Sequence, residues 1–352
     1  MKKKFLLVLL ILSISGGFSF YLWADAVYQG EVSDHFDGRR FHNTFGVETT
    51  NYFASLGNFR NFAWQGVGAW GETKNASYPP PPERVFGDGV RLTFINHSTL
   101  LIQTQGLNIL TDPIWSDYAG PYALVSPSRY RAPGIELDAL PPIDAVVVSH
   151  SHYDHMDLPS LTRLAERFHP RFYVGLGNAS LLQEAGILKV QELDWWTSAS
   201  LSPEIELIGV PAQHWSRRAA LDKDKRLWLG YVFKTPKATY YFAGDTAMGR
   251  HFDEIQKRFG PISLAMLPIG SYRPEVVMRG SHLSPDQALQ AHDLLQSKLS
   301  VAMHFGTFRL GMDGQYEAVD RLKSLLASRK AESNNDFRVL DFGQSLELPT
   351  SP

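Results

Sequence analysis

The sequence predicts an α/β (α+β) protein in which strands and helices share one large domain. Short apolar runs bounded by turn residues recur from residue 90 onward, which is typical of buried strands. Between the later runs lie segments of helical character, one of them opened by a serine cap and a proline. Hydrophobic residues make up 44% of the chain, which is enough for a large core.

In chain order, the first predicted strands form a hairpin, 91–103 and 107–111, with Gly106 in its turn. The run 145–149 is apolar as far as Ser149, so we expect a fully buried strand there, followed by a helix at 159–168 with proline near its start. Further strands are predicted at 172–176, 205–210, 227–234, 239–243, 263–268, 301–304 and 338–340. Further helices are predicted at 248–259, 284–298 and 315–327.

The amino terminus has the pattern of a targeting segment. Three lysines precede an uncharged, leucine-rich run at 5–24, which predicts a signal peptide or an uncleaved membrane anchor over residues 1–26. The small residues Ala24 and Ala26 favour cleavage after Ala26, whereas the aromatic end of the run favours an anchor, and both alternatives stay open. We therefore expect the protein to be exported, periplasmic or anchored to the membrane.

Residues 27–89 are predicted to be an extension of the main domain, 90–352, because they lack clear periodicity. The four prolines at 79–82 predict a stiff, extended connector. We expect the aromatic residues of the extension to hold it against the main domain, and the alternative is that they line an entrance for acyl chains: Phe36, Phe41, Phe45, Tyr52, Phe53, Phe59, Phe62, Trp64 and Trp70.

Charge and cysteine content exclude some classes of function. The net charge is −2 and there are no long runs of like charge, so nothing indicates a nucleic-acid partner. The chain has no cysteine, which excludes disulfides and any site built on thiolate ligands.

Candidate metal ligands cluster directly after the strand predicted at 145–149. His150, His152, Asp154 and His155 fall within six positions, and imidazole and carboxylate are ligands that borderline cations such as Zn²⁺ prefer. Each of three further candidates follows the end of another predicted strand, where loops can converge on one site. These candidates are His214, Asp245 and His304. The sequence therefore predicts a two-metal site.

This ordered set resembles that of the metallo-β-lactamase superfamily. The resemblance extends from about residue 91 to 308 and includes the segments 93–99, 110–117, 211–218, 242–246, 268–272 and 303–308. Within the superfamily, Pro-Ala-Gln-His-Trp at 211–215 is most similar to the N-acylphosphatidylethanolamine-hydrolysing phospholipase D group and its bacterial RomA-type and UlaG-like relatives. The resemblance implies a four-layer αββα sandwich with the metals along one edge of the sheets.

The resemblance also implies how the metals are held. One ion is expected at His150, His152 and His214, and the other at Asp154, His155 and His304, with Asp245 bridging them. The expected cofactors are two Zn²⁺ ions, although Fe or Mn can occupy such sites. A hydroxide shared by the two ions would be the nucleophile. Asp154, Asp245 and His282 are the expected catalytic residues, and His282 would aid the leaving group.

The activity implied is phosphodiester hydrolysis, most specifically phospholipase D-type cleavage of N-acyl-phosphatidylethanolamine-like phospholipids. Two alternatives stay open: hydrolysis of lactone or other acyl bonds at the same metals, and a non-catalytic metal-binding protein of the cell envelope. Antibiotic hydrolysis is not expected, because one lactamase class needs a cysteine ligand that this chain lacks. Expected partners are a phospholipid or other phosphodiester and a membrane surface, with a homodimer left open.

Several residues beside the ligands receive supporting roles. Asp112 is expected to orient a ligating histidine, and His97 to lie near the site. For Arg217 and Arg218 the alternatives are contact with a phosphate and simple solvation. Ser149 and Ser151 are interpreted as small loop residues without a catalytic role. The remaining histidines are assigned to structure: His35, His42, His169, His251 and His292.

Overall fold

The computed structural model describes residues 27–44, 67–329 and 336–348. The predicted signal peptide or anchor at 1–26 lies outside these residues, as do six of the aromatic residues of the extension: Phe45, Tyr52, Phe53, Phe59, Phe62 and Trp64. Within the described ranges, no helix has both the length and the apolar character needed to span a bilayer.

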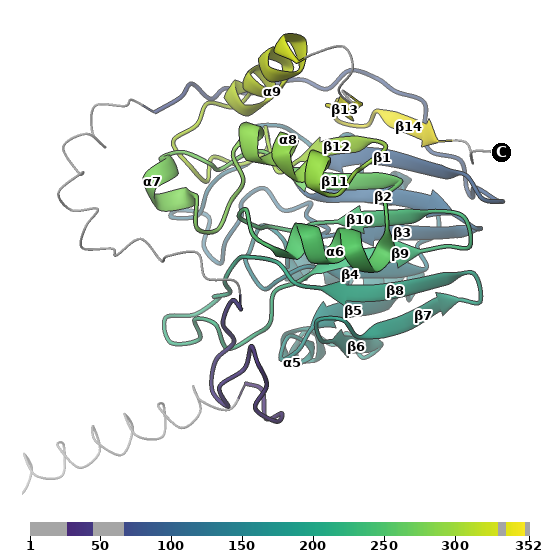
Figure 1. Cartoon of the computed structure of the whole chain (residues 1–352), viewed down its shortest axis with the longest axis vertical. Coiled ribbons are helices and arrows are strands. Elements are labelled where there is room, and N and C mark those ends of the chain that lie inside the picture. Colours follow the sequence, from purple (N-terminus) through teal and green to yellow (C-terminus); the bar gives the residue numbers. More distant parts are fainter. Residues whose placement is uncertain (1–26, 45–66, 330–335, 349–352) are drawn as a thin grey trace, which may run out of the picture.

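Two mixed seven-stranded sheets face each other (Figure 1). The first sheet has the order β14 (Ser345–Leu348), β1 (Val90–Asn96), β2 (Thr99–Thr104), β3 (Leu107–Thr111), β4 (Ala145–Val148), β5 (Arg171–Gly175) and β6 (Val190–Leu193). The second has the order β13 (Phe337–Arg338), β12 (Ser300–Met303), β11 (Leu264–Pro268), β10 (Thr239–Phe242), β9 (Gly230–Lys234), β8 (Ile205–Val210) and β7 (Ser198–Ser202).

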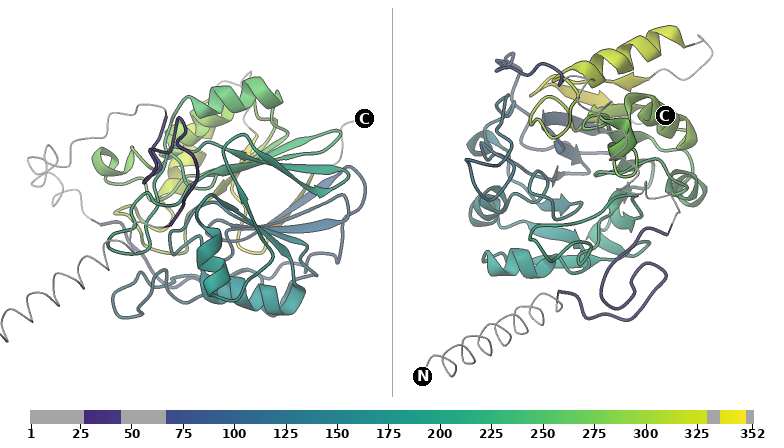
Figure 2. Two further views of the ribbon diagram at one scale, coloured as in Figure 1. Left: turned by 90° about the horizontal axis from the view of Figure 1, so that it is seen from below. Right: turned by 90° about the vertical axis from the view of Figure 1, so that its left-hand side faces the viewer.

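Helices cover the outer faces of both sheets, as the edge-on views in Figure 2 show. The first sheet carries α4 (Leu158–Phe168) and α5 (Ala179–Glu184), and the second carries α6 (His251–Phe259), α8 (Pro285–Leu294) and α9 (Glu317–Ser328). Two short elements, η1 (Leu137–Ala139) and α7 (Glu275–Met278), lie in connections. The predicted four-layer αββα sandwich is therefore confirmed.

Strand β4 shows how the sequence divides the core. Val146 and Val148 pack against α4 and α5, whereas Ala145 and Val147 face the opposite sheet. Successive side chains of a strand point to opposite faces, so an apolar residue at every position is needed when both faces are covered. The uninterrupted apolar run that predicted a buried strand has this physical origin.

A buried tyrosine links the two sheets. Tyr231 on β9 donates its hydroxyl to the carbonyls of Val148 and Tyr173, each at 2.9 Å. Tyr241, one strand away on β10, is equally buried, but its hydroxyl has no hydrogen-bond partner among the described residues. The Tyr231 hydroxyl therefore connects the two sheets by hydrogen bonds, whereas the Tyr241 hydroxyl does not.

Some element boundaries differ from those predicted. β9 begins at Gly230 and not at 227, because Leu227 and Leu229 donate their N–H groups to carbonyls outside the strand ladder, those of Leu176 and Ser149. Helix α6 begins at His251, three residues later than expected, and α8 ends at Leu294 and not at 298. The predicted strand 91–103 is wrong as one element: it is two strands, β1 and β2, with a turn at 97–98. The short strands β6, β7 and β14 and the short helices α5 and α7 were not predicted.

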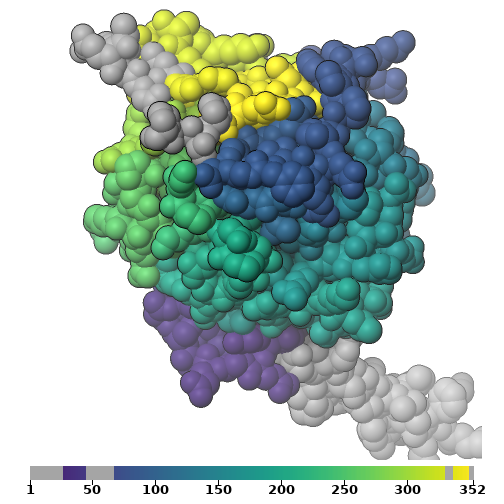
Figure 3. Space-filling model, turned by 90° about the vertical axis from the view of Figure 1, so that its right-hand side faces the viewer, coloured from purple at the N-terminus to yellow at the C-terminus, as the bar shows by residue number. Residues whose placement is uncertain are grey.

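The described part of the extension packs against the main domain. Segment 27–44, purple in Figure 3, lies against the main domain, where His35 contacts Asp194 in the β6–β7 connection and the Phe41 N–H donates to the Asp224 carbonyl in the β8–β9 connection. Phe36 and Phe41 are buried in the core, and Trp70 packs on Tyr130 with 5.2 Å between ring centroids. At these three positions, the expectation that aromatic residues attach the extension is confirmed.

Strand direction places the loops that carry the candidate ligands at one edge of the sandwich. β10, β11 and β12 are mutually parallel, and so are β3, β4 and β5. β8 runs in the same direction as β10, because each is antiparallel to β9 between them. Loops that leave the carboxyl ends of such strands meet at one edge of each sheet.

Candidate metal centre

All the side chains predicted to bind metal meet at the edge where β4, β8, β10 and β12 end. Their nitrogen and oxygen atoms form overlapping groups, in each of which the atoms lie within 4.8 Å of one another. These side chains are His150, His152, Asp154, His155, His214, Asp245 and His304. The structure thus gathers every nominated ligand into one candidate metal centre, and His97 and His282 join it.

His150, His152 and His214 form the first group. Nε2 of His150 and Nε2 of His214 lie 2.8 Å and 3.2 Å from the same atom, Nδ1 of His152. Nitrogens bound tetrahedrally to one zinc at about 2.0–2.1 Å are about 3.3 Å apart, so the spacing is close to that of a shared cation. His214 Nδ1 donates to the carbonyl of Ser281 at 2.8 Å, which leaves its Nε2 lone pair facing the group.

Asp112 orients two of the rings, as the sequence predicted for one. Its Oδ2 accepts from His155 Nδ1 at 2.7 Å and from the Ser149 hydroxyl at 2.6 Å. Because that hydroxyl gives its proton to Asp112, the Ser149 oxygen accepts from His150 Nδ1 at 2.9 Å. Both rings therefore carry their proton on Nδ1 and turn Nε2 toward the centre. Ser149, which we expected to be only a small loop residue, therefore helps to orient the His150 ring.

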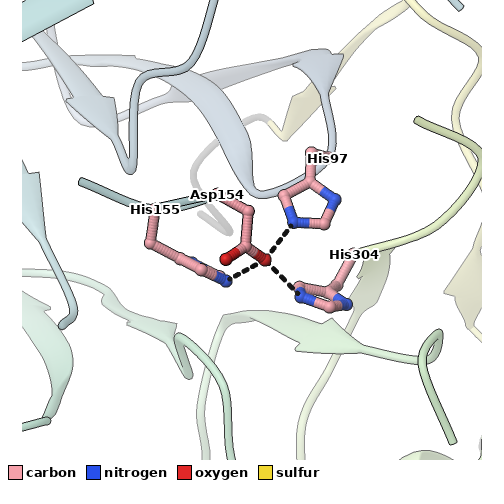
Figure 4. Close-up of side chains that lie close together, drawn as sticks. All are labelled: His97, Asp154, His155 and His304. Carbon is pink, nitrogen blue, oxygen red and sulfur yellow. Dashed lines mark hydrogen bonds and ion pairs between the residues drawn. The ribbon is translucent and has the colours of Figure 1, made fainter. Parts of the chain in front are cut away.

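Asp154, His155 and His304 form the second group, drawn in Figure 4. Oδ2 of Asp154 lies 3.2 Å from His155 Nε2 and 3.5 Å from His304 Nε2. The same oxygen lies 3.0 Å from His97 Nε2, and the His97 N–H donates to Thr307 Oγ1 at 3.0 Å. His97 is therefore placed to hold the Asp154 carboxylate, which agrees with its predicted position near the site.

Asp245 lies between the two groups. Its Oδ2 is 3.2 Å from Nε2 of both His155 and His304, and 3.8 Å from His214 Nε2. Its Oδ1 is buried and has no hydrogen-bond partner among the described residues, and the same is true of Nε2 of His155 and of His304. Polar atoms buried without a hydrogen bond cost about 1–3 kcal/mol each, so a cluster of them is consistent with a cation-binding site.

The two groups differ in their titration. Burial holds the pKa of His150 and His214 well below 6.5 and lowers the pKa of His152 to about 4. Burial would also lower the pKa of His155 and His304, but nearby carboxylates outweigh it. The pKa of His155 is raised well above 6.5 and that of His304 is raised to about 9. The first group is therefore neutral at pH 7 and the second carries protons.

The two carboxylates complement those protons. Burial alone would raise the pKa of Asp154 and of Asp245, but His155 and His304 outweigh it and hold both values well below 3.8. Both side chains are thus ionised, which is the state in which carboxylates bind cations.

His282 faces the centre from the segment after α7. Its Nδ1 lies 3.8 Å from Asp245 Oδ2, and its ring lies 5.2 Å from that of His214. The side chain is 12% exposed, and burial lowers the pKa of His282 to about 4. The ring is therefore neutral at pH 7 and can serve as a hydrogen-bonding group.

Arg218 differs from both alternatives drawn from the sequence. Its guanidinium donates to the carbonyls of Ser151 and Met156 and lies over the ring of Tyr153, 4.0 Å from the centroid. It therefore supports the loop that carries four candidate ligands and is neither simply solvated nor directed at a phosphate. Arg217 is exposed.

Comparison with known proteins assigns the class. Residues 107–305 match the family model described as the beta-lactamase superfamily domain, so the chain belongs to this superfamily and is a metal-dependent hydrolase. Among its relatives, N-acyl-phosphatidylethanolamine-hydrolyzing phospholipase D 1 of Caenorhabditis elegans is 34% identical over 271 residues, which cover 74% of this chain and 76% of that protein. The predicted resemblance is confirmed.

Two further relatives widen the comparison. An uncharacterised protein of Mycobacterium tuberculosis is 37% identical over 275 residues, covering 75% of this chain and 72% of its own length. Among solved structures, isothiocyanate hydrolase from Delia radicum gut bacteria superposes with a TM-score of 0.59 and 20% identity, covering 73% of this chain and 98% of that one. At that identity the likeness supports the fold alone.

Proposed function

We propose that the protein hydrolyses phosphodiesters with two zinc ions, and that its substrates are N-acyl-phosphatidylethanolamine-like phospholipids cleaved in the phospholipase D sense. The observation that carries the proposal is the donor set: three imidazoles in one group, two imidazoles and a carboxylate in the other, and Asp245 between them. The similarity to a phospholipase D of the same specificity supports the choice of bond.

The proposed ligand assignment follows these groups. The first ion would be held by His150, His152 and His214, the second by Asp154, His155 and His304, and both by Asp245. Two such ions supply Lewis acidity toward a phosphoryl oxygen and a nucleophile from water at neutral pH. Water is then added across the bond between phosphorus and the ethanolamine oxygen, which yields phosphatidic acid and an N-acylethanolamine.

Several side chains around the candidate ligands would contribute to this reaction by holding the ligands or the substrate in place. His97 holds Asp154, and Asp112 fixes the rings of His150 and His155, so the donor atoms are in place before substrate arrives. His282 is neutral at pH 7, so a ring N–H can give the departing ethanolamine oxygen a hydrogen bond, while the proton that this oxygen gains comes from the water that is added. We therefore assign His282 to the leaving group.

An exposed apolar loop supports a lipid substrate. In the loop 119–127, the side chains of Tyr122, Leu124 and Val125 are 70%, 99% and 80% exposed. At its base, Ala119 packs with Phe308, whose ring meets that of His97 edge-on at 5.5 Å. The loop thus projects apolar side chains from the wall of the metal centre, which suits contact with a membrane surface. Export or membrane anchoring through residues 1–26 belongs to the same proposal.

The test uses zinc-loaded protein and vesicles that contain N-acyl-phosphatidylethanolamine, with products read by mass spectrometry. The unmodified protein should release phosphatidic acid, and Asp154→Asn should not. If a protein with two zinc ions per chain releases no product, the phospholipid assignment is wrong. Lactones and small soluble phosphodiesters would then separate acyl hydrolysis from other phosphodiester hydrolysis.

A further inference from the structure

Asn43 lies in the amino-terminal extension, outside the matched region 107–305, yet it contacts a candidate metal ligand. Its Nδ2 donates to the carbonyl oxygen of His214 at 2.8 Å, and its Oδ1 accepts from the His214 N–H at 3.2 Å. The same Oδ1 accepts from Trp228 Nε1 at 3.0 Å. One amide therefore holds both sides of the His214 backbone and connects it to a buried tryptophan.

Asn43 is itself fixed, because the segment 27–44 is tied to the main domain. The Phe41 N–H donates to the Asp224 carbonyl at 2.7 Å, and the Phe41 ring is 2% exposed. His35 stacks on Trp195 with 4.3 Å between ring centroids. A segment with buried anchors can present the Asn43 amide in one position.

The hydrogen bonds of His214 divide between ring and backbone. Its Nδ1 donates to the Ser281 carbonyl, which sets the direction of the ring. In the described ranges, the hydrogen bonds made by its backbone N–H and carbonyl are those to Asn43. The residue is 2% exposed, so without Asn43 both backbone groups would be left without partner in a buried place.

We propose that Asn43 is a positioning residue of the metal centre, so that the amino-terminal extension helps to build the site. The inference rests on the proposed role of His214 as a ligand. Loss of the Asn43 amide would leave His214 free to shift from the first group, whose nitrogens now lie at 2.8 Å and 3.2 Å. Metal sites depend on such supporting contacts, whose removal typically lowers metal affinity about 10–100-fold.

Asn43→Ala tests the proposal, with Asn75→Ala as the matched control. Asn75 also belongs to the extension and makes three hydrogen bonds to the main domain, to the carbonyls of Ala132 and Pro133 and from Arg131 Nε. None of these partners is a candidate ligand. Full-length variants would be compared by zinc affinity in chelator competition, by the visible absorption of the cobalt-substituted protein, and by thermal unfolding without metal.

We expect Asn43→Ala to bind one of its two zinc ions about 10–100-fold more weakly and to change the cobalt spectrum, while Asn75→Ala changes neither. Asn43→Asp keeps the acceptor for the His214 and Trp228 N–H groups but sets a carboxylate oxygen against the His214 carbonyl, so it should also weaken zinc binding and change the cobalt spectrum, which provides a test if the alanine variant does not fold. An Asn43→Ala protein that is merely less stable, with unchanged zinc affinity and cobalt spectrum, would overturn the proposal. Failure of phospholipid hydrolysis in the unmodified protein would affect the proposed function and not this inference.

Discussion

Zinc uptake by the two groups should differ in its pH dependence. His150, His152 and His214 are neutral at pH 7, because burial lowers the pKa of each ring. His304 is protonated at pH 7, because Asp245 and Asp154 outweigh burial and raise its pKa to about 9. A cation that binds at the second group must displace this proton, whereas one that binds at the first group need not.

The size of the effect follows from the distance between pH and pKa. A pH of 7 lies about 2 units below the pKa of His304, which is about 9. Displacing the His304 proton at this pH therefore weakens zinc binding about 100-fold, or about 2.7 kcal/mol. Affinity at the second group should therefore rise about tenfold per pH unit from 7 toward 9. The pKa of His155 is raised as well, so displacing its proton adds to the slope.

Calorimetric titration of metal-free protein measures this directly. Zinc would be added at three pH values within about one unit of neutrality, roughly 6.5, 7.2 and 8.0. At each pH, two buffers with different ionisation enthalpies would be compared, because the difference in heat gives the number of protons released. One binding event should release about one to two protons and tighten with pH, and the other should release almost none. Two events with equal proton release and equal pH dependence would refute the charge assignment of the groups.

Substitutions at three places test other parts of the structure. Asp112→Asn should lower zinc affinity about 10–100-fold in chelator competition, because one amide oxygen cannot accept from both the Ser149 N–H and His155 Nδ1; unchanged affinity would contradict the orienting role. Leu124→Asp combined with Val125→Asp should weaken sedimentation with phospholipid vesicles about tenfold or more. Hydrolysis of a soluble phosphodiester should stay unchanged. Equal losses of vesicle binding and of soluble-phosphodiester hydrolysis would argue against a membrane-contacting loop. Tyr231→Phe should lower the free energy of unfolding by about 1–3 kcal/mol, since two buried carbonyls lose their donor. Tyr241→Phe is the control and should be neutral or stabilising in the same denaturant titration, because its hydroxyl has no partner in the described part of the chain.

The convergence of the candidate ligands at one edge could be predicted because their signal is local. His150, His152, Asp154 and His155 follow one apolar strand within six positions, and the others stand directly after strand ends. Strand ends are readable from the apolar pattern, and parallel strands place those ends at a common edge. The buried strands were predictable for the same reason, since strands buried on both faces leave uninterrupted apolar runs, whereas the four-layer arrangement was expected from the family resemblance.

Asp112 and His97 were predicted beside the site, but other supporting contacts could not be predicted because they join distant parts of the chain. Asn43 and His214 are 171 positions apart, and nothing in the composition near Asn43 indicates a ligand. Ser149 gained its role only through the position of the Asp112 carboxylate. Strand β7 was missed because its edge position lets it carry Ser198, Ser200 and Ser202 in place of an apolar pattern.

The most direct test of the central claim is zinc-edge anomalous diffraction from crystals of the zinc-loaded protein. Two peaks about 3.5–4 Å apart should appear at the edge of the sheets, one on each side of Asp245. The first should lie among His150, His152 and His214, and the second among Asp154, His155 and His304. A single peak, or peaks away from these side chains in a protein that holds two zinc ions per chain, would contradict the account.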